Sequence, residues 1–74
     1  MRPRAGDIVK LRYDREPTRW QVVWMERISS TGYTVPDAEW WLHLQQADYD
    51  DVCIRVTLPE TMVEVVHPVR RPSI

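Results

Sequence analysis

The sequence predicts an all-β fold, a five-stranded antiparallel small barrel, and three observations indicate it. Aromatic and β-branched residues are concentrated in two runs, 19–25 and 39–44. Short stretches in which apolar and polar residues alternate, typical of strands with one buried face, recur along the chain. Turn-forming residues separate these stretches, and no window shows a sustained helical period. Because a flat sheet of this size would leave long edges exposed, we expect it to close into a barrel.

The first two strands are predicted over residues 8–13 and 19–28. Apolar and basic residues alternate over 8–13, directly after Gly6-Asp7, which indicates a half-buried strand. A turn follows, because Pro17 cannot donate a sheet hydrogen bond. The second strand is apolar on both faces, so the pattern leaves open which face is buried; one face carries Trp20, Val22 and Trp24, and the other carries Val23 and Met25.

The remaining elements are three strands and one helical turn. A polar turn is predicted at 29–32, where Gly32 is free to adopt a positive φ, and residues 33–35 can form a short strand. The third strand is predicted over 40–46, and an acidic loop follows at 47–51. The fourth strand, 52–58, has the cleanest alternation. Pro59 can begin a single 3₁₀ turn that ends at Met62, and a fifth strand at 63–66 closes the barrel.

These elements divide the chain into three parts. We expect a flexible N-terminal arm at residues 1–5, the barrel at 6–67 and a C-terminal tail at 68–74. The alternation predicts a core made of Val9, Leu11, Leu42, Leu44, Ile54, Val56, Val63 and Val65.

Composition limits the kind of protein. The chain has 74 residues, enough for one small domain, and 10 basic against 11 acidic residues give a net charge of −1, which argues against a general nucleic-acid coat. Its one cysteine, Cys53, cannot form an intramolecular disulfide or a cysteine-based zinc site and fits a reducing compartment. No apolar stretch approaches the ~20 residues of a membrane span or resembles a signal peptide. We therefore predict a cytoplasmic protein that does not enter a membrane.

Three stretches resemble the Src-homology-3 (SH3) domains and their small-barrel relatives. Leu11-Arg12-Tyr13-Asp14 is similar to part of the family's ALYDY motif, and Glu39-Trp40-Trp41-Leu42 is similar to its paired tryptophans with a following leucine. The segment 58–65 resembles the closing part of the family, an aliphatic-proline pair followed by a 3₁₀ turn and the last strand. The stretches occur in the family's order, and the resemblance implies an SH3-like barrel.

The chain also departs from the family pattern. Only residues 14–18 separate the first two strands, where the family has a long acidic loop. Arg15 stands at the second tyrosine position of the motif, and Met62 replaces the tyrosine of the ligand groove. The Gly6-Asp7 start is more similar to bacterial and ribosomal members, so the resemblance implies a bacterial or phage protein. It implies the fold more than it implies binding of proline-rich peptides.

The aromatic residues are the strongest candidates for a partner site, because there are more of them than so small a core easily hides. They are Tyr13, Trp20, Trp24, Tyr33, Trp40, Trp41 and Tyr49. The resemblance implies that Tyr13, Trp40, Pro59 and Met62 meet at one rim as a flat, apolar site for an unknown protein or peptide, or for a weak homodimer. Strict alternation instead turns Trp41 outward and Trp40 inward. A third interpretation, in which all four tryptophans belong to the core, stays open.

Four arginines near the termini indicate an alternative function. Arg2, Arg4, Arg70 and Arg71 would lie close together if the ends of the barrel meet, and with exposed aromatics they could bind nucleic acid. The near-neutral charge disfavours this alternative, and arginines in such tails are more often simply solvated.

Groups for catalysis or metal binding are sparse. His43 and His67 are the only histidines, and Cys53 is predicted on an outward face without a base to activate it. The acidic loop lacks the glycine and the closing glutamate of a calcium loop, and two glycines are too few for a phosphate cradle. We therefore predict a non-enzymatic protein without metal or cofactor, with a protein-interaction or structural role.

Overall fold

The structure, a computed structural model, is one sheet of five antiparallel strands in the order β4-β3-β2-β1-β5. It describes residues 2–15, 18–47 and 54–69. The strands are β1 (Ile8–Leu11), β2 (Trp20–Arg27), β3 (Trp40–Gln46), β4 (Arg55–Pro59) and β5 (Val63–His67); the 3₁₀ turns are η1 (Ile28–Thr31) and η2 (Glu60–Met62). The predicted all-β fold, with five antiparallel strands and a 3₁₀ turn before the last one, is confirmed.

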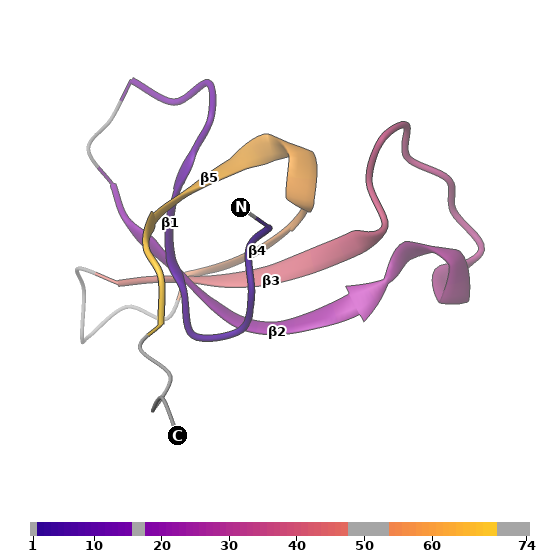
Figure 1. Cartoon of the computed structure of the whole chain (residues 1–74), viewed down its shortest axis with the longest axis horizontal. Coiled ribbons are helices and arrows are strands. Elements are labelled where there is room, and N and C mark those ends of the chain that lie inside the picture. Colours follow the sequence, from indigo (N-terminus) through magenta and orange to yellow (C-terminus); the bar gives the residue numbers. More distant parts are fainter. Residues whose placement is uncertain (1, 16–17, 48–53, 70–74) are drawn as a thin grey trace.

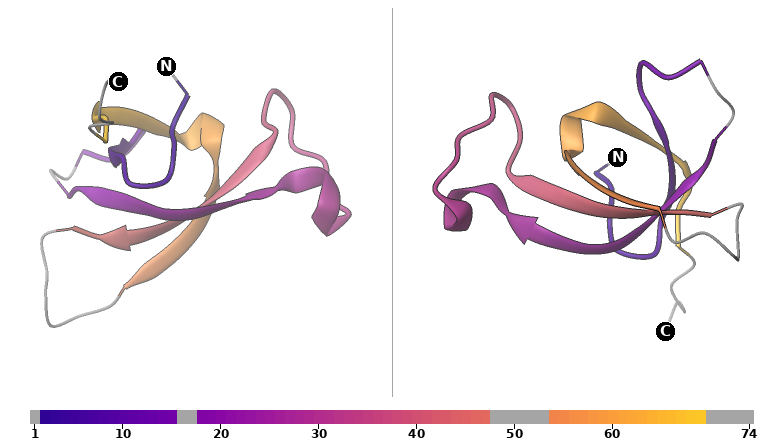
Figure 2. Two further views of the ribbon diagram at one scale, coloured as in Figure 1. Left: turned by 60° about the horizontal axis from the view of Figure 1, so that its bottom comes forward. Right: turned by 180° about the vertical axis from the view of Figure 1, so that it is seen from behind.

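The sheet curls around a small core (Figures 1 and 2). β2 and β3 are the longest strands and cross the middle of the molecule, with β1 and β5 beyond β2 and β4 beyond β3. η2 turns the chain from β4 into β5. Residues 28–39, which include η1, project from one end of the sheet, at the right of Figure 1.

The core is formed by side chains from β1, β2, β3 and β5 that point into the curl. The buried cluster consists of Val9, Trp20, Val22, Leu42, Leu44 and Val63, and Leu11, Met25, Trp40, Val56, Leu58 and Val65 pack against it. The prediction that Ile54 belongs to the core is wrong. This side chain is 43% exposed, because β4 begins only at Arg55 and Ile54 lies beyond the last β3–β4 pair.

A register shift in the middle of β2 decides which of its faces is buried. Val22 pairs with Leu44 and Trp24 pairs with His43, so Val23 is an extra residue, as in a β-bulge. Before the shift Val22 points inward, and after it Met25 packs against the core. Trp24 is turned outward and is 48% exposed. Residues from both apolar faces of the sequence pattern therefore point inward, Trp20 and Val22 before the shift and Met25 after it.

The buried carboxylate of Asp7 joins the two ends of the described chain. Its Oδ2 accepts a hydrogen bond from Arg4 N at 2.9 Å, and its Oδ1 accepts one from Val69 N at 2.8 Å. A Cβ at Gly6 would lie 3.1 Å from Val69 Cγ2, so glycine permits the close approach. Residues 2–5, expected to form a flexible arm, lie against the sheet, where Pro3 is buried.

Three local features differ from the sequence predictions. β1 ends at Leu11 because its carbonyl accepts a turn hydrogen bond from Asp14 N at 3.2 Å, so Tyr13 lies in that turn and not in a strand. Residues 33–35 are not a strand. η1 is a second 3₁₀ turn that the sequence did not predict, and Gly32 ends it with a φ of 84°, as its freedom to adopt positive φ predicts.

Several sequence predictions fall outside the described residues. They concern the aspartates of the acidic loop, Tyr49, Val52 and Cys53 in the first part of the predicted fourth strand, and Arg70 and Arg71 of the C-terminal tail.

The core assignment can be tested with two aliphatic truncations. Leu44→Ala removes a fully buried side chain and should cost about 2–5 kcal/mol of unfolding free energy. Ile54→Ala removes an exposed one and should cost less than about 1 kcal/mol. Urea unfolding followed by tryptophan fluorescence measures both. Equal losses in the two variants would show that the described end of β4 is misplaced.

Candidate functional site

The outer face of β2, β3 and β4 carries two cross-strand rows of side chains. The strand register places Trp24, His43 and Thr57 in one row and Glu26, Trp41 and Pro59 in the next. Leu42 and Leu44 of β3 point into the core, and residues two apart share a face of a strand, so Trp41 and His43 point outward.

Trp24 and His43 form a stacked pair in the first row. Their ring centroids are 3.8 Å apart and their planes differ by 6°. His43 Nδ1 lies 3.1 Å from Thr57 Oγ1, and Nε2 lies 3.6 Å from Glu26 Oε1 without a hydrogen-bond partner among the described residues. The stack holds the indole against the sheet although it is exposed, which presents a flat, ordered aromatic surface.

A hollow of about 340 Å³ lies where the projecting segment meets this face. It is lined by Glu26, Thr31, Tyr33, Trp41 and Thr57. The rings of Tyr33 and Trp41 lie with centroids 6.5 Å apart and planes at 83°, so they form two walls of a corner. The volume is at the low end of roughly 300–1,000 Å³ for ligand pockets. We call Trp24, Tyr33, Trp41 and His43 the outer aromatic face.

Two hydrogen bonds fix the indole of Trp41 in this hollow. Trp41 Nε1 donates to Thr31 Oγ1 at 3.2 Å, and the Thr31 hydroxyl donates to the carbonyl of Ile28 at 2.6 Å. Through Thr31, η1 therefore fixes the orientation of the Trp41 ring. Its outward placement is the one that strict alternation predicts.

Trp40 lies on the other side of β3, where it packs against the core. The guanidinium of Arg27 lies 4.7 Å from the centroid of the Trp40 ring. Residues 2–4 lie beside the same ring and line a small hollow with it and Met25. The N-terminal segment is therefore the neighbour of Trp40 on the surface where the resemblance implies a ligand groove.

The buried carboxylate of Glu60 holds this arrangement together. Its Oε2 accepts hydrogen bonds from Glu39 N at 2.7 Å and from Trp40 N at 3.0 Å. Its Oε1 lies 3.4 Å from Arg2 Nε, and Arg2 also pairs with the Glu39 carboxylate at 3.1 Å. One side chain of η2 thus connects the start of β3 to the N-terminal segment.

The other residues predicted for a partner site lie in two places. Pro59 is the cross-strand partner of Trp41 on the outer face. The carbonyl of Met62 accepts a hydrogen bond from Arg12 N at 2.8 Å. This bond brings Tyr13, which follows Arg12 in the chain, near η2. Tyr13 is 79% exposed. The structure thus brings Pro59 next to Trp41 and Tyr13 near Met62, whereas Trp40 faces the core.

Of the four arginines of the nucleic-acid alternative, the described ones are Arg2 and Arg4. Arg2 is bound by two carboxylates, so its charge is compensated within the protein. Arg4 is exposed, and its backbone N–H is held by Asp7. Asp7 also binds the backbone N–H of Val69, so residues 4 and 69 lie close together, and Arg70 and Arg71 lie outside the described residues.

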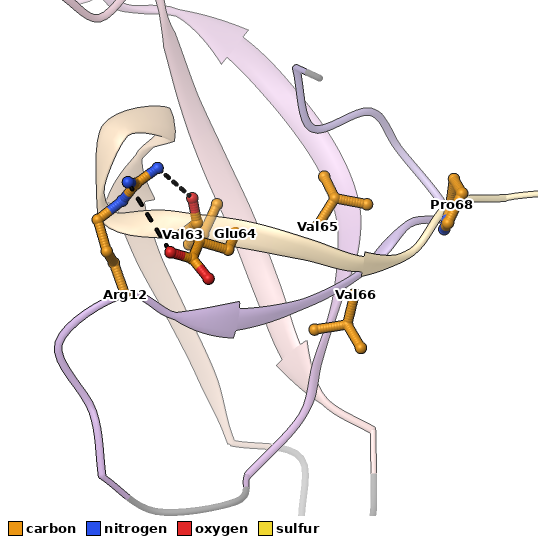
Figure 3. A pocket seen from close by; sticks show the side chains of 6 residues that line it. All are labelled: Arg12, Val63, Glu64, Val65, Val66 and Pro68. Carbon is orange, nitrogen blue, oxygen red and sulfur yellow. Dashed lines mark hydrogen bonds and ion pairs between the residues drawn. The ribbon is translucent and has the colours of Figure 1, made fainter.

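A larger hollow, of about 460 Å³, runs along β5, and it is a poorer candidate. Figure 3 shows its lining, in which Arg12 reaches toward the carbonyl of Val63 (3.4 Å) and the carboxylate of Glu64 (3.9 Å). Val65 and Val66 point to opposite sides of the strand. Its two charged side chains compensate each other, and none of its lining side chains is aromatic.

Within residues 2–15, 18–47 and 54–69, no three histidine, cysteine or acidic side chains are grouped as a metal site. The same part of the chain contains no helix that is long and apolar enough to cross a membrane.

Trp24, Tyr33 and Glu26 could not be predicted from the sequence to share one surface. Trp24 was among the candidate aromatics, but alternation places it on the same face as Trp20 and Val22, which are inward, and only the register shift turns it outward. Tyr33 was counted among the surplus aromatics, but no local pattern places it beside Trp41. Glu26, the last residue but one of β2, is charged, and its charge was the one sequence feature that indicated an outward position.

Comparisons with protein-family models, with curated proteins and with solved structures find no match for this chain.

Glu60→Ala tests the role of the buried carboxylate. It should lower the unfolding free energy by about 1.5–3 kcal/mol, because two backbone N–H groups lose a charged acceptor. Glu64→Ala removes an exposed carboxylate that pairs with Lys10 and should cost at most about 1 kcal/mol. Thermal melting of both variants, followed by circular dichroism, makes the comparison. A smaller loss for Glu60→Ala than for Glu64→Ala would contradict this role.

Proposed function

We propose that this chain is a non-enzymatic SH3-like small barrel that binds a protein partner on the outer aromatic face. The observation that carries the proposal is the exposure of ordered aromatic rings beside a hollow. Trp24 is 48% exposed and Tyr33 is 69% exposed. Large aromatic side chains dominate the binding energy of protein interfaces, and their exposure in a small domain marks a partner site.

The ordering of these rings supports binding rather than incidental exposure. Trp24 is held by the stack on His43, and Trp41 is held by its hydrogen bond to Thr31. A ring that is already fixed loses little conformational entropy when a partner covers it. The outer aromatic face therefore has the properties of a preorganised anchor surface.

A partner at Trp40 is less well supported. Residues 2–4 lie beside that ring, and Arg2 forms ion pairs with the carboxylates of Glu39 and Glu60. A ligand there would first have to displace a segment that the protein itself supplies. The outer aromatic face requires no such step.

The proposal favours a protein over nucleic acid. A nucleic-acid surface combines exposed aromatics with cations that contact phosphates. The hollow beside Trp41 instead contains the carboxylate of Glu26, which would repel phosphates. Arg2, one of the arginines of the alternative, is engaged with acidic side chains.

Selection of binding peptides from a random phage-displayed library tests the proposal directly. We expect the selected peptides to lose about 10–30-fold in affinity on Trp41→Ala and on Trp24→Ala, the range typical of aromatic anchors at interfaces. Tyr13→Ala is the control, since it removes an exposed aromatic from another surface and should leave the affinity unchanged. Thermal melts establish that each variant is folded.

Two results would contradict the proposal. One is a set of peptides that bind the wild type and depend on Tyr13 but not on Trp24 or Trp41. The other is self-association through the same face, which sedimentation equilibrium would reveal as a dimer mass that falls to the monomer mass on Trp24→Ala. We expect a monomer whose mass the substitution does not change.

A further inference from the structure

The geometry points to an arginine side chain of the partner as the group that enters the hollow between Tyr33 and Trp41. This inference rests on the proposed function and names the chemistry by which the outer aromatic face selects its partner. The guanidinium would lie in the corner of the two rings and pair with the carboxylate of Glu26. A protein segment that presents an exposed arginine is therefore the partner that fits.

The two aromatic walls favour a cation. The face of an aromatic ring carries partial negative charge and attracts a cation within about 6 Å of the ring centroid. The rings of Tyr33 and Trp41 are almost perpendicular and both line the hollow, so a cation in the corner is close to both. The same chemistry already occurs within this protein, where the guanidinium of Arg27 lies 4.7 Å from the centroid of Trp40.

The charge of the hollow points the same way. Glu26 is the one acidic side chain of its lining. Among the described residues, the ion pair formed by Glu26 is with His43 at 3.6 Å, so neither lysine nor arginine compensates the carboxylate. Arg55 shares the outer face of β4 and lies two residues from Thr57 of the lining, which is about 7 Å along a strand. Its guanidinium does not line the hollow and forms no ion pair with Glu26, so among the described residues the carboxylate stays without a lysine or arginine partner.

An arginine fits this site better than a lysine does. Guanidinium is planar, stacks on aromatic rings, is weakly hydrated and can donate two hydrogen bonds to one carboxylate. The ammonium group of lysine is a strongly hydrated point charge, and an open apolar corner offers little to replace its water. The hollow should therefore discriminate between the two cations.

The position of the hollow explains how a peptide would continue beyond the arginine. Trp41 and Glu26 belong to the row next to Trp24 and His43, so the stacked pair lies directly beside the hollow. Thr57 belongs to the first row and also lines the hollow, so it connects the two areas. An arginine in the hollow thus places neighbouring residues of its chain over the exposed face of Trp24.

The test is a titration of the full chain with N-acetylargininamide, followed by amide and indole NMR shifts at low salt. We expect saturable shifts at Glu26, Tyr33 and the Trp41 indole N–H, with a Kd on the order of 10 mM for so small a probe. N-acetylcitrullinamide has nearly the same shape without the charge, and it should bind at least about five-fold more weakly. N-acetyllysinamide should also bind more weakly than the arginine probe.

Variants of the chain locate the binding. Tyr33→Ala removes one exposed wall and Glu26→Gln removes the charge while keeping the shape, so each should raise the Kd of the arginine probe about five-fold. Tyr13→Ala should leave it unchanged. Substituting citrulline for arginine in a selected peptide should lower the affinity by the same factor or more.

The possible failures are distinguishable. Equal binding of the arginine and citrulline probes, or selected peptides that use the outer aromatic face without an arginine, would overturn this inference and leave the proposed function standing. Peptides that bind elsewhere, together with no probe shifts at Tyr33 and Trp41, would overturn both.

Discussion

The register shift at Val23 is the constraint on which the surface of this protein depends. The first half of β2 buries Trp20 and Val22, and the same strand then needs Met25 opposite Leu42 in the core. One extra residue satisfies both requirements and leaves Trp24 pointing outward, opposite His43. Without the shift, Trp24 would take the inward position opposite Leu42 that Met25 now holds, and the outer face would lose its largest exposed ring. The bulge that keeps both halves of β2 packed on the core thus also produces the exposed aromatic surface.

Two buried carboxylates explain why the opposite surface is closed. Asp7 binds backbone N–H groups of Arg4 and Val69, and Glu60 binds those of Glu39 and Trp40. Hydrogen bonds to charged acceptors are stronger than bonds between neutral groups, so these acids fix the segments that they bind. Through Arg2, Glu60 also keeps the N-terminal segment near Trp40. An aromatic ring that the chain itself covers contributes to stability, and a ring that the chain leaves open is available to a partner.

The sequence predicted the fold well because short-range patterns determine it. The alternation in β3 identified Leu42 and Leu44 as buried and placed Trp41 outward, and Pro59 marked the 3₁₀ turn before the last strand. Errors occurred where non-local pairing decides. Ile54 continues the alternation of its segment but lies beyond the last β3–β4 pair, so no pattern within the segment could show that it is exposed. The corner of Tyr33 and Trp41 depends on a hydrogen bond between η1 and β3, which joins residues ten positions apart in the chain and follows no periodicity.

Nuclear Overhauser contacts of the Trp24 indole test the register shift at Val23 directly, because the outer aromatic face exists only if this ring points outward. We expect contacts between the indole protons and the ring protons of His43, with Met25 contacting Leu42 on the opposite face of the strand. Contacts between the Trp24 indole and the methyl groups of Val9 or Leu44, with unbroken pairing through Val23, would place the ring in the core and contradict the account.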